Sequence, residues 1–264
     1  MADDWRTTVA DNADHAHGTQ LTHFGYSEVG EAEKASRVAE MFACVASRYD
    51  LMNDLMTWGL HRGWKDEAVR MTGIGLGDRV LDLAGGTGDI AIRLAARVGQ
   101  AGHVTLADIN PAMLSEAQRR LTGHRHQGRI SVVEADAEIL PFSDAAFDAV
   151  IIGFGLRNVT YQAKALQEMY RVLKPGGRLV VLEFSRPVTW LVRPFYDAYS
   201  FAVIPALGRI VLQDPASYRY LAESIRMHPD RHALLRMLEG AGLESCWVRK
   251  MFFGIVAIHH GVKR

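Results

Sequence analysis

The stretch Val80-Leu-Asp-Leu-Ala-Gly-Gly-Thr-Gly-Asp89 decides the fold of this chain. Its first four residues are mostly apolar, and a short apolar run of this kind predicts a strand buried in a sheet. Gly85, Gly86 and Gly88 permit a tight turn and let the backbone approach a ligand closely. A helical pattern begins at Asp89. Strand, glycine turn and helix together indicate a ligand site beyond the carboxyl end of the strand in a Rossmann-like sheet.

The segments after this turn alternate between strand-like and helix-like patterns. Such alternation predicts a parallel sheet with helices on both faces. We therefore predict an α/β Rossmann-like fold of class I, with a seven-stranded, mostly parallel sheet and helical cap segments. The predicted strands are Arg79–Leu83, His103–Ala107, Ile130–Glu134, Phe147–Ile152, Arg178–Glu183, and a closing pair, Leu243–Val248 and Gly254–His260; the predicted helices are Asp89–Val98, Pro111–Leu121 and Tyr161–Leu173.

The remaining segments divide the chain into a tail and one domain. Residues 1–25 form a polar tail without the apolar core of a secretory signal, and we expect them to be disordered. Residues 26–264 are expected to form a single domain. Within it, residues 26–75 are expected to make an N-terminal helical cap, and residues 186–240 a helical insertion over the site. Apolar spacing predicts the cap helices at Lys34–Ser47 and Tyr49–Arg70.

The composition argues against several classes of function. The 30 Lys and Arg residues balance the 30 Asp and Glu residues, so the chain lacks the basic excess that non-specific nucleic-acid binding requires. Its 2 cysteines form no CxxC pair, and no His, Cys and Glu residues stand at metal-ligand spacing, so we expect no disulfide framework and no metal. A membrane-spanning helix needs about 20 apolar residues, and the most apolar stretch in the second half of the chain is shorter than that. We expect a soluble or peripheral protein in a reducing compartment.

The acidic residue inside the first strand bears on the ligand. The spacing Gly-Gly-Thr-Gly differs from the Gly-x-Gly-x-x-Gly pattern of dinucleotide sites. We predict that the Asp82 carboxylate would repel a diphosphate and attract a cation such as a sulfonium. This favours S-adenosylmethionine over a nicotinamide dinucleotide, with a dehydrogenase as the enzyme alternative. The protein is thus expected to be an S-adenosylmethionine-dependent methyltransferase.

Further cofactor contacts are predicted at the ends of the next strands. Asp108 is placed to accept hydrogen bonds from the ribose hydroxyls, with helix capping as the alternative. Asp136 would take the adenine amino group while Ala137 lies against the ring. Gly153 is expected beneath the methionine part, and Met113 supplies apolar contact or packs in the core. The residues predicted here to bind the cofactor are Asp82, Gly85, Gly86, Gly88, Asp108, Met113, Asp136, Ala137 and Gly153.

Two longer segments carry a more specific resemblance. Tyr49–Trp64 and Arg171–Ser185 resemble the two signatures of the ubiquinone/menaquinone biosynthesis C-methyltransferases, the UbiE family, and Phe154–Val159 and Ser217–Pro229 are also similar to that family. The resemblance runs from about Tyr26 to the C-terminus. It implies methylation of a ring carbon of 2-methoxy-6-polyprenyl-1,4-benzoquinol, of demethylmenaquinol, or of both. It also implies cofactor contacts from Thr87, Asp108, Asp136 and Ala137.

The chain departs from the family pattern at two places. Gly153 stands where a serine is frequent, so one side-chain contact to the cofactor is lost or is replaced by the backbone. Lys250-Met251-Phe252 replaces the usual Asn-Leu-Thr, which makes this edge more apolar and could alter how the prenyl tail is held.

The predicted chemistry needs a group that activates the acceptor ring. A quinol carbon becomes a better nucleophile when its neighbouring hydroxyl is polarised, and a nearby cation lowers the pKa of a phenol. Arg157 is our first choice for that cation, with a structural ion pair as the alternative, and Asn158 is expected to orient the hydroxyl. Tyr49 would cover the cofactor. His61 has the pKa for proton transfer but also fits a structural role.

The expected surroundings are a membrane surface and a long apolar tail. Two apolar stripes, one from Met52 to Trp64 and one from Trp190 to Phe201, fit a prenyl tunnel or ordinary core packing. We expect a cytoplasmic protein, peripheral at the inner face of the bacterial inner membrane. The resemblance implies other quinone-pathway enzymes as partners; a homodimer is left open, and no nucleic acid is expected. The alternatives are a methyltransferase for another phenol or a sterol, and a non-catalytic S-adenosylmethionine-binding protein.

Overall fold

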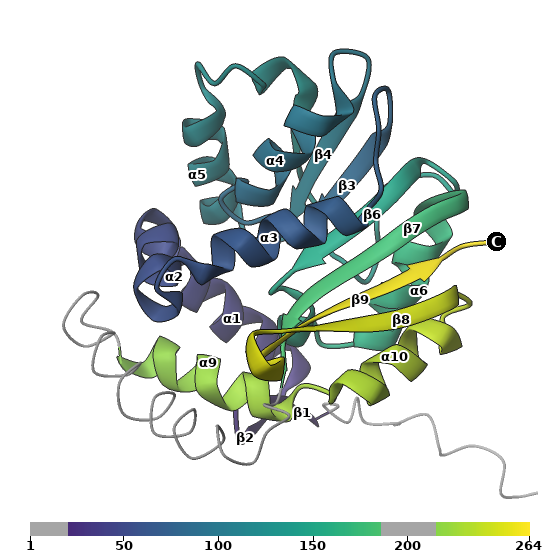
Figure 1. Cartoon of the computed structure of the whole chain (residues 1–264). Helices are drawn as coiled ribbons and strands as arrows, with labels where there is room; N and C mark the ends of the chain where they lie inside the picture. Colours follow the sequence, from purple (N-terminus) through teal and green to yellow (C-terminus); the bar gives the residue numbers. More distant parts are fainter. Residues whose placement is uncertain (1–20, 186–214) are drawn as a thin grey trace, which may run out of the picture.

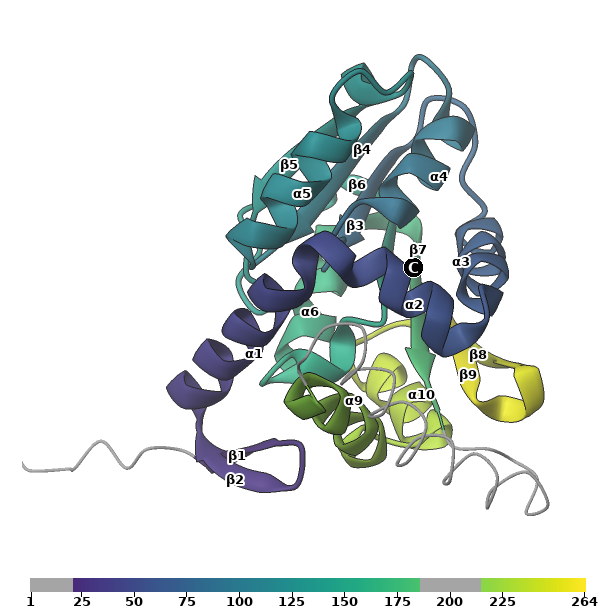
Figure 2. The same ribbon diagram turned by 90° about the vertical axis from the view of Figure 1, so that its left-hand side faces the viewer.

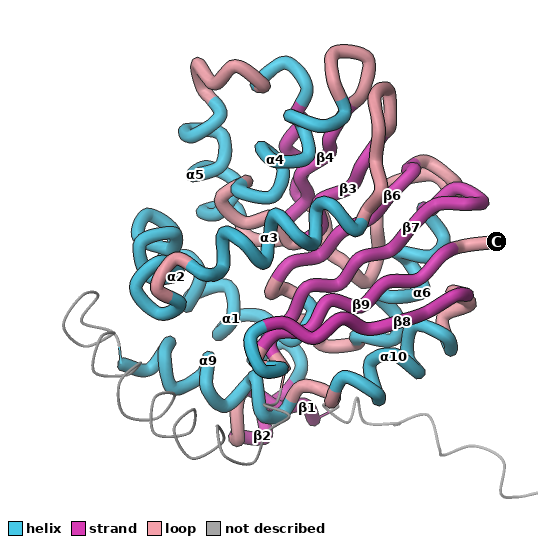
Figure 3. The backbone as a smooth tube through the Cα atoms, in the orientation of Figure 1, coloured by secondary structure: helices cyan, strands magenta, loops and turns pink. Residues whose placement is uncertain are grey.

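One seven-stranded sheet forms the centre of the computed structural model, which describes residues 21–185 and 215–264 (Figure 1). The strand order is β5-β4-β3-β6-β7-β9-β8, and β9 alone among these strands runs antiparallel to its neighbours (Figure 3). The predicted mostly parallel sheet and the closing strand pair are confirmed. The strands are β3 (Arg79–Leu83), β4 (His103–Asp108), β5 (Ile130–Glu134), β6 (Phe147–Gly153), β7 (Leu173–Phe184), β8 (Glu244–Met251) and β9 (Val256–Val262).

Helices cover both faces of the sheet because successive strand residues point to opposite sides. Val80 packs with α3 (Leu60–Met71), α4 (Asp89–Val98) and α5 (Pro111–Leu121). The next residue, Leu81, packs on the other face with α6 (Gln162–Val172) and α10 (Arg231–Gly240). Local signals set the helix starts. The side chain of Asn110 caps α5 by accepting hydrogen bonds from two backbone N–H groups, and a proline follows it.

The N-terminal region differs in two ways from the prediction. Residues 21–25 were expected to belong to the disordered tail, but β1 (Leu21–Phe24) pairs with β2 (Ser27–Gly30) as a hairpin. The turn is made possible by Gly25, whose φ is +60°. Residues 26–75 are therefore not wholly helical, although α1 (Glu31–Val45) follows at once. Residues 1–20 lie outside the described residues.

The predicted helix Tyr49–Arg70 is divided into two. α2 (Tyr49–Thr57) ends at Trp58, and Gly59 precedes α3; both residues have left-handed φ values, 52° and 72°. The short 3-10 helices are η1 (Ala46–Arg48), η2 (Gln127–Arg129), η3 (Leu156–Asn158) and η5 (Phe252–Gly254).

The insertion expected over residues 186–240 is helical where the structure describes it. α9 (Pro215–Met227) and α10 follow one another there. The apolar stripe from Trp190 to Phe201 lies outside the described residues. Within 21–185 and 215–264, no helix is both long enough and apolar enough to cross a membrane.

Candidate active site

A cavity of about 390 Å³ lies at the carboxyl ends of β3, β4 and β6. This is the edge at which ligands bind in open parallel sheets, and the volume suits a small-molecule cofactor. Helix α1 runs across this edge (Figure 2) and closes the cavity with an apolar face. The lining residues include eight that the sequence predicts: Tyr49, Gly86, Asp108, Met113, Asp136, Ala137, Gly153 and Asn158.

The glycine turn forms the floor of this cavity. Gly86 and Gly88 have φ values of 54° and 83°, which favour glycine. A Cβ atom on Gly85 would lie only 2.8 Å from the side chain of Leu106 and 3.0 Å from an oxygen of Asp82. The three glycines thus have the roles predicted for a tight turn, although Gly86 alone of them lines the cavity.

The structure corrects the predicted contact between Asp82 and the cofactor. The Asp82 side chain is fully buried beneath the turn and does not line the cavity. Neither of its carboxylate oxygens has a hydrogen-bond partner among the described residues. Burial raises the pKa of Asp82 to about 8. An acid that lies under the turn, outside the cavity lining and with a raised pKa, is not placed to contact a sulfonium directly, so the structure does not support this step of the sequence reasoning.

Asp108, for which a ribose contact is predicted, lies at the end of β4 in the wall of the cavity. Its two oxygens accept hydrogen bonds from the backbone N–H groups of Gly86 and Asn110, both at 2.9 Å, and the residue lines the cavity. Asn110 is the cap of α5, so the capping alternative for Asp108 does not apply. Burial raises the pKa of Asp108, while the backbone N–H groups oppose that shift. A carboxylate accepts more than two hydrogen bonds, so capacity remains for a ligand.

Two other residues predicted to contact the cofactor, Asp136 and Met113, have different neighbours. Asp136 is exposed and accepts a hydrogen bond from the N–H of Glu138 at 2.9 Å, which orients it beside buried Ala137. Met113 lines the cavity and also packs against Val45, so both readings of this residue apply.

Gly153 has a steric reason to lack a side chain. A Cβ atom at this position would collide with Cδ1 of Ile90, the second residue of α4. The space that a serine would occupy is therefore filled by Ile90, and only the backbone of residue 153 faces the cofactor cavity.

A second, smaller cavity of about 60 Å³ adjoins the first. Phe42, Tyr49 and Phe154 line both, so the two spaces meet at these rings. The walls of the second cavity combine methionine and aromatic side chains with several polar and charged groups. Its other lining residues are Met41, Val45, Met52, Asn53, Met56, Thr57, His61, Lys65, Arg157, Phe184, Ser217, Tyr218, Tyr220 and Leu221.

Arg157 supplies a buried cation to this second cavity. Its guanidinium forms an ion pair with Glu183 of β7 at 2.8 Å, and it also donates to the carbonyl of Phe154. The backbone N–H of Arg157 donates to the same carboxylate at 3.3 Å. The structural ion pair named as the alternative is therefore present, and the arginine still lines the cavity. Sequence reasoning missed Glu183, because residues 26 positions apart carry no sign of pairing.

Asn158 is held by a residue that the sequence did not single out. The hydroxyl of Tyr220 on α9 donates a hydrogen bond of 3.1 Å to the side-chain oxygen of Asn158. Burial raises the pKa of Tyr220 to about 12, so its hydroxyl stays protonated and continues to donate. The ring of Phe24 in β1 stacks on Tyr220 with centroids 4.1 Å apart. The N-terminal hairpin thus supports the wall of the second cavity.

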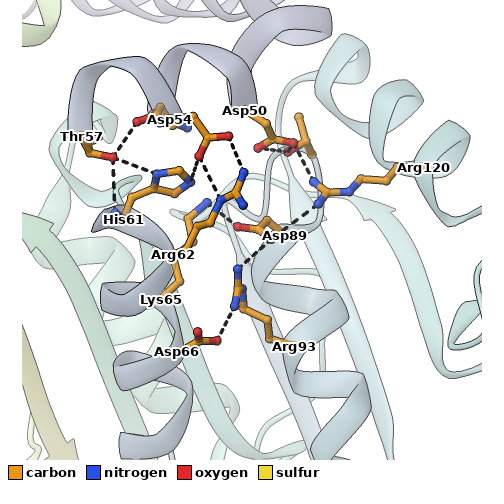
Figure 4. A network of polar contacts seen from close by, with 12 residues as sticks. Asp50, Asp54, Thr57, His61, Arg62, Lys65, Asp66, Asp89, Arg93 and Arg120 are labelled. Carbon is orange, nitrogen blue, oxygen red and sulfur yellow. Dashed lines mark hydrogen bonds and ion pairs between the residues drawn. The ribbon is translucent and has the colours of Figure 1, made fainter. Parts of the chain in front are cut away.

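The structure favours a structural role for His61. Its Nδ1 lies 2.9 Å from the hydroxyl of Thr57, and its Nε2 lies 3.7 Å from Asp54, so both nitrogens face α2 (Figure 4). Burial, followed by the charge of Lys65, lowers the pKa of His61. The residue lines the second cavity, but its ring nitrogens join α3 to α2. His228, His259 and His260 line neither cavity.

Thr87 also departs from its expected position. Its hydroxyl is buried and donates to the carboxylate of Asp50 at 3.2 Å, and the residue does not line the cofactor cavity. No cluster of three or more His, Cys, Asp or Glu side chains that could hold a metal occurs in the described parts of the chain.

Comparison with known proteins gives this geometry a family. The model of the ubiE/COQ5 methyltransferase family matches residues 30–263. The chain belongs to the ubiE/COQ5 methyltransferase family. A relative from Pseudomonas putida, named ubiquinone/menaquinone biosynthesis C-methyltransferase UbiE, is 53% identical over 250 residues, covering 95% of this chain and 97% of the relative. A protein of the same name from Azotobacter vinelandii is 53% identical over 242 residues, covering 92% and 96%.

The likeness to solved structures extends to the fold alone. A S-adenosylmethionine-dependent methyltransferase from Aquifex aeolicus aligns with a TM-score of 0.56 at 17% identity, covering 76% of this chain and 89% of that one. This member of the ubiE/COQ5 methyltransferase family is an S-adenosylmethionine-dependent enzyme, as the sequence predicts. The large cavity fits that cofactor because its lining combines carboxylates, Asp108 and Asp136 among them, with apolar side chains such as Ala137 and Met113.

Proposed function

We propose that the protein methylates a ring carbon of a polyprenyl quinol, 2-methoxy-6-polyprenyl-1,4-benzoquinol or demethylmenaquinol. The observation that carries the proposal is the second cavity. Its aromatic and methionine walls suit a planar ring with an apolar tail, and its buried Arg157 suits a phenolic oxygen. The two relatives, both named as ubiquinone/menaquinone biosynthesis C-methyltransferases, support the same acceptor.

The bound cofactor supplies a methyl group already activated by a positive sulfur. The chain must place the acceptor carbon about 3–3.5 Å from that methyl group and increase its electron density. Arg157 is always protonated, so it acts through charge, by stabilising the phenolate form of the acceptor. Asn158, fixed by the Tyr220 hydroxyl, lines the cofactor cavity and not the second one, so it would reach the oxygen of the acceptor only where the two spaces meet. The rings at the junction exclude water, which strengthens the interaction between the guanidinium and the phenolate.

Quinone profiling tests this proposal. A strain lacking the protein should accumulate an unmethylated benzoquinol or demethylmenaquinone, and the purified enzyme should methylate the corresponding quinols. The same assay separates the two branches and the rival acceptors, another phenol or a sterol. Normal quinones together with a change in an unrelated phenol would refute the quinol acceptor. Cofactor binding without turnover on any of these acceptors would favour the non-catalytic alternative.

We also propose that the protein works at the surface of the inner membrane, on its cytoplasmic side. A polyprenyl acceptor resides in the bilayer, so the second cavity must open toward it. Apolar side chains on α2, which lines that cavity, support this orientation: Leu51, Leu55 and Trp58 are exposed, Trp58 to 83%. Exposed aromatic side chains of this kind are typical of membrane-contacting surfaces. Partnership with other quinone-pathway enzymes and a homodimer remain predictions.

Vesicle binding tests the orientation with a matched control. Trp58→Ser should weaken sedimentation with vesicles that contain anionic phospholipid. Leu76→Ser is the control, because Leu76 is equally exposed at 84% but follows the far end of α3. Equal loss in the two variants, or no binding by the unmodified protein, would contradict the proposed face.

A further inference from the structure

Asp50 contacts two other parts of the molecule from the first turn of α2. Helix α2 begins without a side-chain cap, so Asp50 does not cap it. Its carboxylate accepts a hydrogen bond from the Thr87 hydroxyl, with the two oxygens at 3.2 and 3.3 Å. It also forms an ion pair of 2.7 Å with Arg120 in the last turn of α5 (Figure 4). Asp50 therefore links α2 to the glycine turn and to α5.

Arg120 extends this link to the start of α4. A second nitrogen of its guanidinium lies 3.5 Å from Asp89, which also accepts a hydrogen bond from Lys65 of α3 at 2.8 Å. Thr87 and Asp89 flank Gly88 in the glycine turn. The polar network thus joins the acceptor-side helices α2 and α3 to the turn that forms the floor of the cofactor cavity.

The polar network bears on catalysis through the position of Tyr49. This residue precedes Asp50 in the same helical turn and lines both cavities at the point where they meet. Helix α2 otherwise packs mainly against η1 and α3, its neighbours along the chain. Because Tyr49 and Asp50 are consecutive residues, a rotation of α2 that breaks the Asp50 contacts also displaces the Tyr49 ring.

We propose that Asp50 and Arg120 are positioning residues for methyl transfer: together they hold Tyr49 at the junction of the two cavities, in register with the glycine turn. This inference rests on the proposed function. Alignment of the acceptor carbon with the methyl group tolerates little error, since a displacement of about 1 Å can reduce turnover about 100-fold. The network supplies that alignment from outside the cavities, because neither Asp50 nor Arg120 lines one.

The solvent exposure of Asp50 and Arg120 allows a role in positioning to be distinguished from a role in folding. The side chains of Asp50 and Arg120 are 40% and 34% exposed, and ion pairs of this exposure contribute little to stability. Loss of Arg120 should therefore lower the melting temperature by less than about 4 °C. A residue that acts only on folding would show the reverse pattern, a large thermal shift with turnover retained in the folded fraction.

The main test compares two adjacent arginines of α5. Arg120→Ala should reduce kcat by about 3- to 10-fold, because an ion pair of this exposure can bias the position of α2 only by its own small free energy. The affinity for S-adenosylhomocysteine, measured by calorimetry, should stay within about threefold, and Arg120→Lys should restore part of the rate. Arg119→Ala is the matched control, because Arg119 is 74% exposed and pairs with Glu116 inside the same helix. Equal kcat in the two alanine variants would overturn the proposal, as would a loss of cofactor affinity that matches the loss of rate.

Two further measurements locate the effect. Asp50→Asn keeps an oxygen for Thr87 but removes the charge that attracts Arg120. Adding Arg120→Ala to it should therefore cause no further loss of kcat, and additive losses would overturn the pairing.

Amide hydrogen exchange of residues 49–57 can be measured without any acceptor substrate. It should accelerate in Arg120→Ala and not in Arg119→Ala, and unchanged exchange would overturn the proposal. Accelerated exchange in an enzyme that methylates no quinol would refute the proposed function and leave the positioning of α2 standing.

Discussion

The double role of Arg157 can be separated by removing both members of its ion pair in turn. Arg157→Met deletes the charge but keeps much of the apolar length of the side chain. Glu183→Gln removes the opposing charge and keeps one oxygen, which can accept from the backbone N–H of either Phe184 or residue 157, the two groups that donate to separate oxygens of Glu183. The double variant therefore lacks the cation without leaving a buried carboxylate alone.

The magnitudes follow from burial. The side chains of Arg157 and Glu183 are only 5% and 1% exposed, so Arg157→Met leaves an uncompensated buried charge, which costs about 3–5 kcal/mol of unfolding free energy. For a chain of this size that cost corresponds to a fall in melting temperature of roughly 6–20 °C. Adding Glu183→Gln should recover most of the loss. Turnover should stay about 100- to 1000-fold low in both variants, the range for losing one stabilising group at a developing negative charge.

The assay combines thermal unfolding, methyl transfer to a short-chain quinol and calorimetry with S-adenosylhomocysteine. We expect unchanged cofactor affinity throughout, because Arg157 does not line the cofactor cavity. Recovery of turnover together with stability in the double variant would show that the arginine is only structural. An Arg157→Met variant as stable as the unmodified protein would show that the pair is not buried as described.

Two other predictions concern the cofactor turn. Gly153→Ser should lower the free energy of unfolding by about 1–3 kcal/mol through overpacking. Ile90→Val removes the colliding Cδ1, so it should restore most of that stability in the double variant. A serine variant as stable as the unmodified protein in chemical denaturation would contradict the steric account. The raised pKa of Asp82, about 8, means that the folded state favours the neutral acid. Stability should therefore be greatest below about pH 4 for this group and fall by up to roughly 6 kcal/mol as the pH rises to 8. Asp82→Asn should remove that slope in urea denaturation at several pH values, and an unchanged slope would assign it to other groups.

The core of the fold could be predicted because its signals are local. β3, β5, α4 and α5 have the predicted bounds, since buried parallel strands read as short apolar runs and Asn110-Pro111 marks a helix start. The hairpin at β1 and β2 escaped prediction, because a four-residue strand gives too little periodicity for a pattern to be recognised. The division of Tyr49–Arg70 was missed although the sequence marks it: Gly59 adopts the left-handed conformation beside Trp58, and a glycine just past a helix end is a local stop signal.

Site residues at the ends of strands could be predicted from the sequence, whereas contacts between residues far apart in the sequence could not. Asp108 ends β4 and Asp136 comes two residues after β5, and parallel topology brings such positions together. Asp82 misled the charge reasoning because its side chain lies within a strand rather than at its end. The alternation that places Leu81 and Leu83 in the core beside α6 turns Asp82 to the opposite face, under the turn. Tyr220, 62 residues from Asn158, could be found only once α9 was placed.

The arrangement of the two cavities explains why a shared fold does not determine an acceptor. The strand ends and glycine turn build the cofactor cavity, and these are the parts that a Rossmann-like sheet supplies in any sequence. The second cavity is built mostly by α1, α2, α3, α9 and η3, which lie outside the sheet; Phe184 at the end of β7 is the contribution of a sheet strand. Changes in these helices can alter the acceptor without disturbing the sheet. Reaction still requires both cavities in register, and Tyr49 is the residue of α2 that lines both of them.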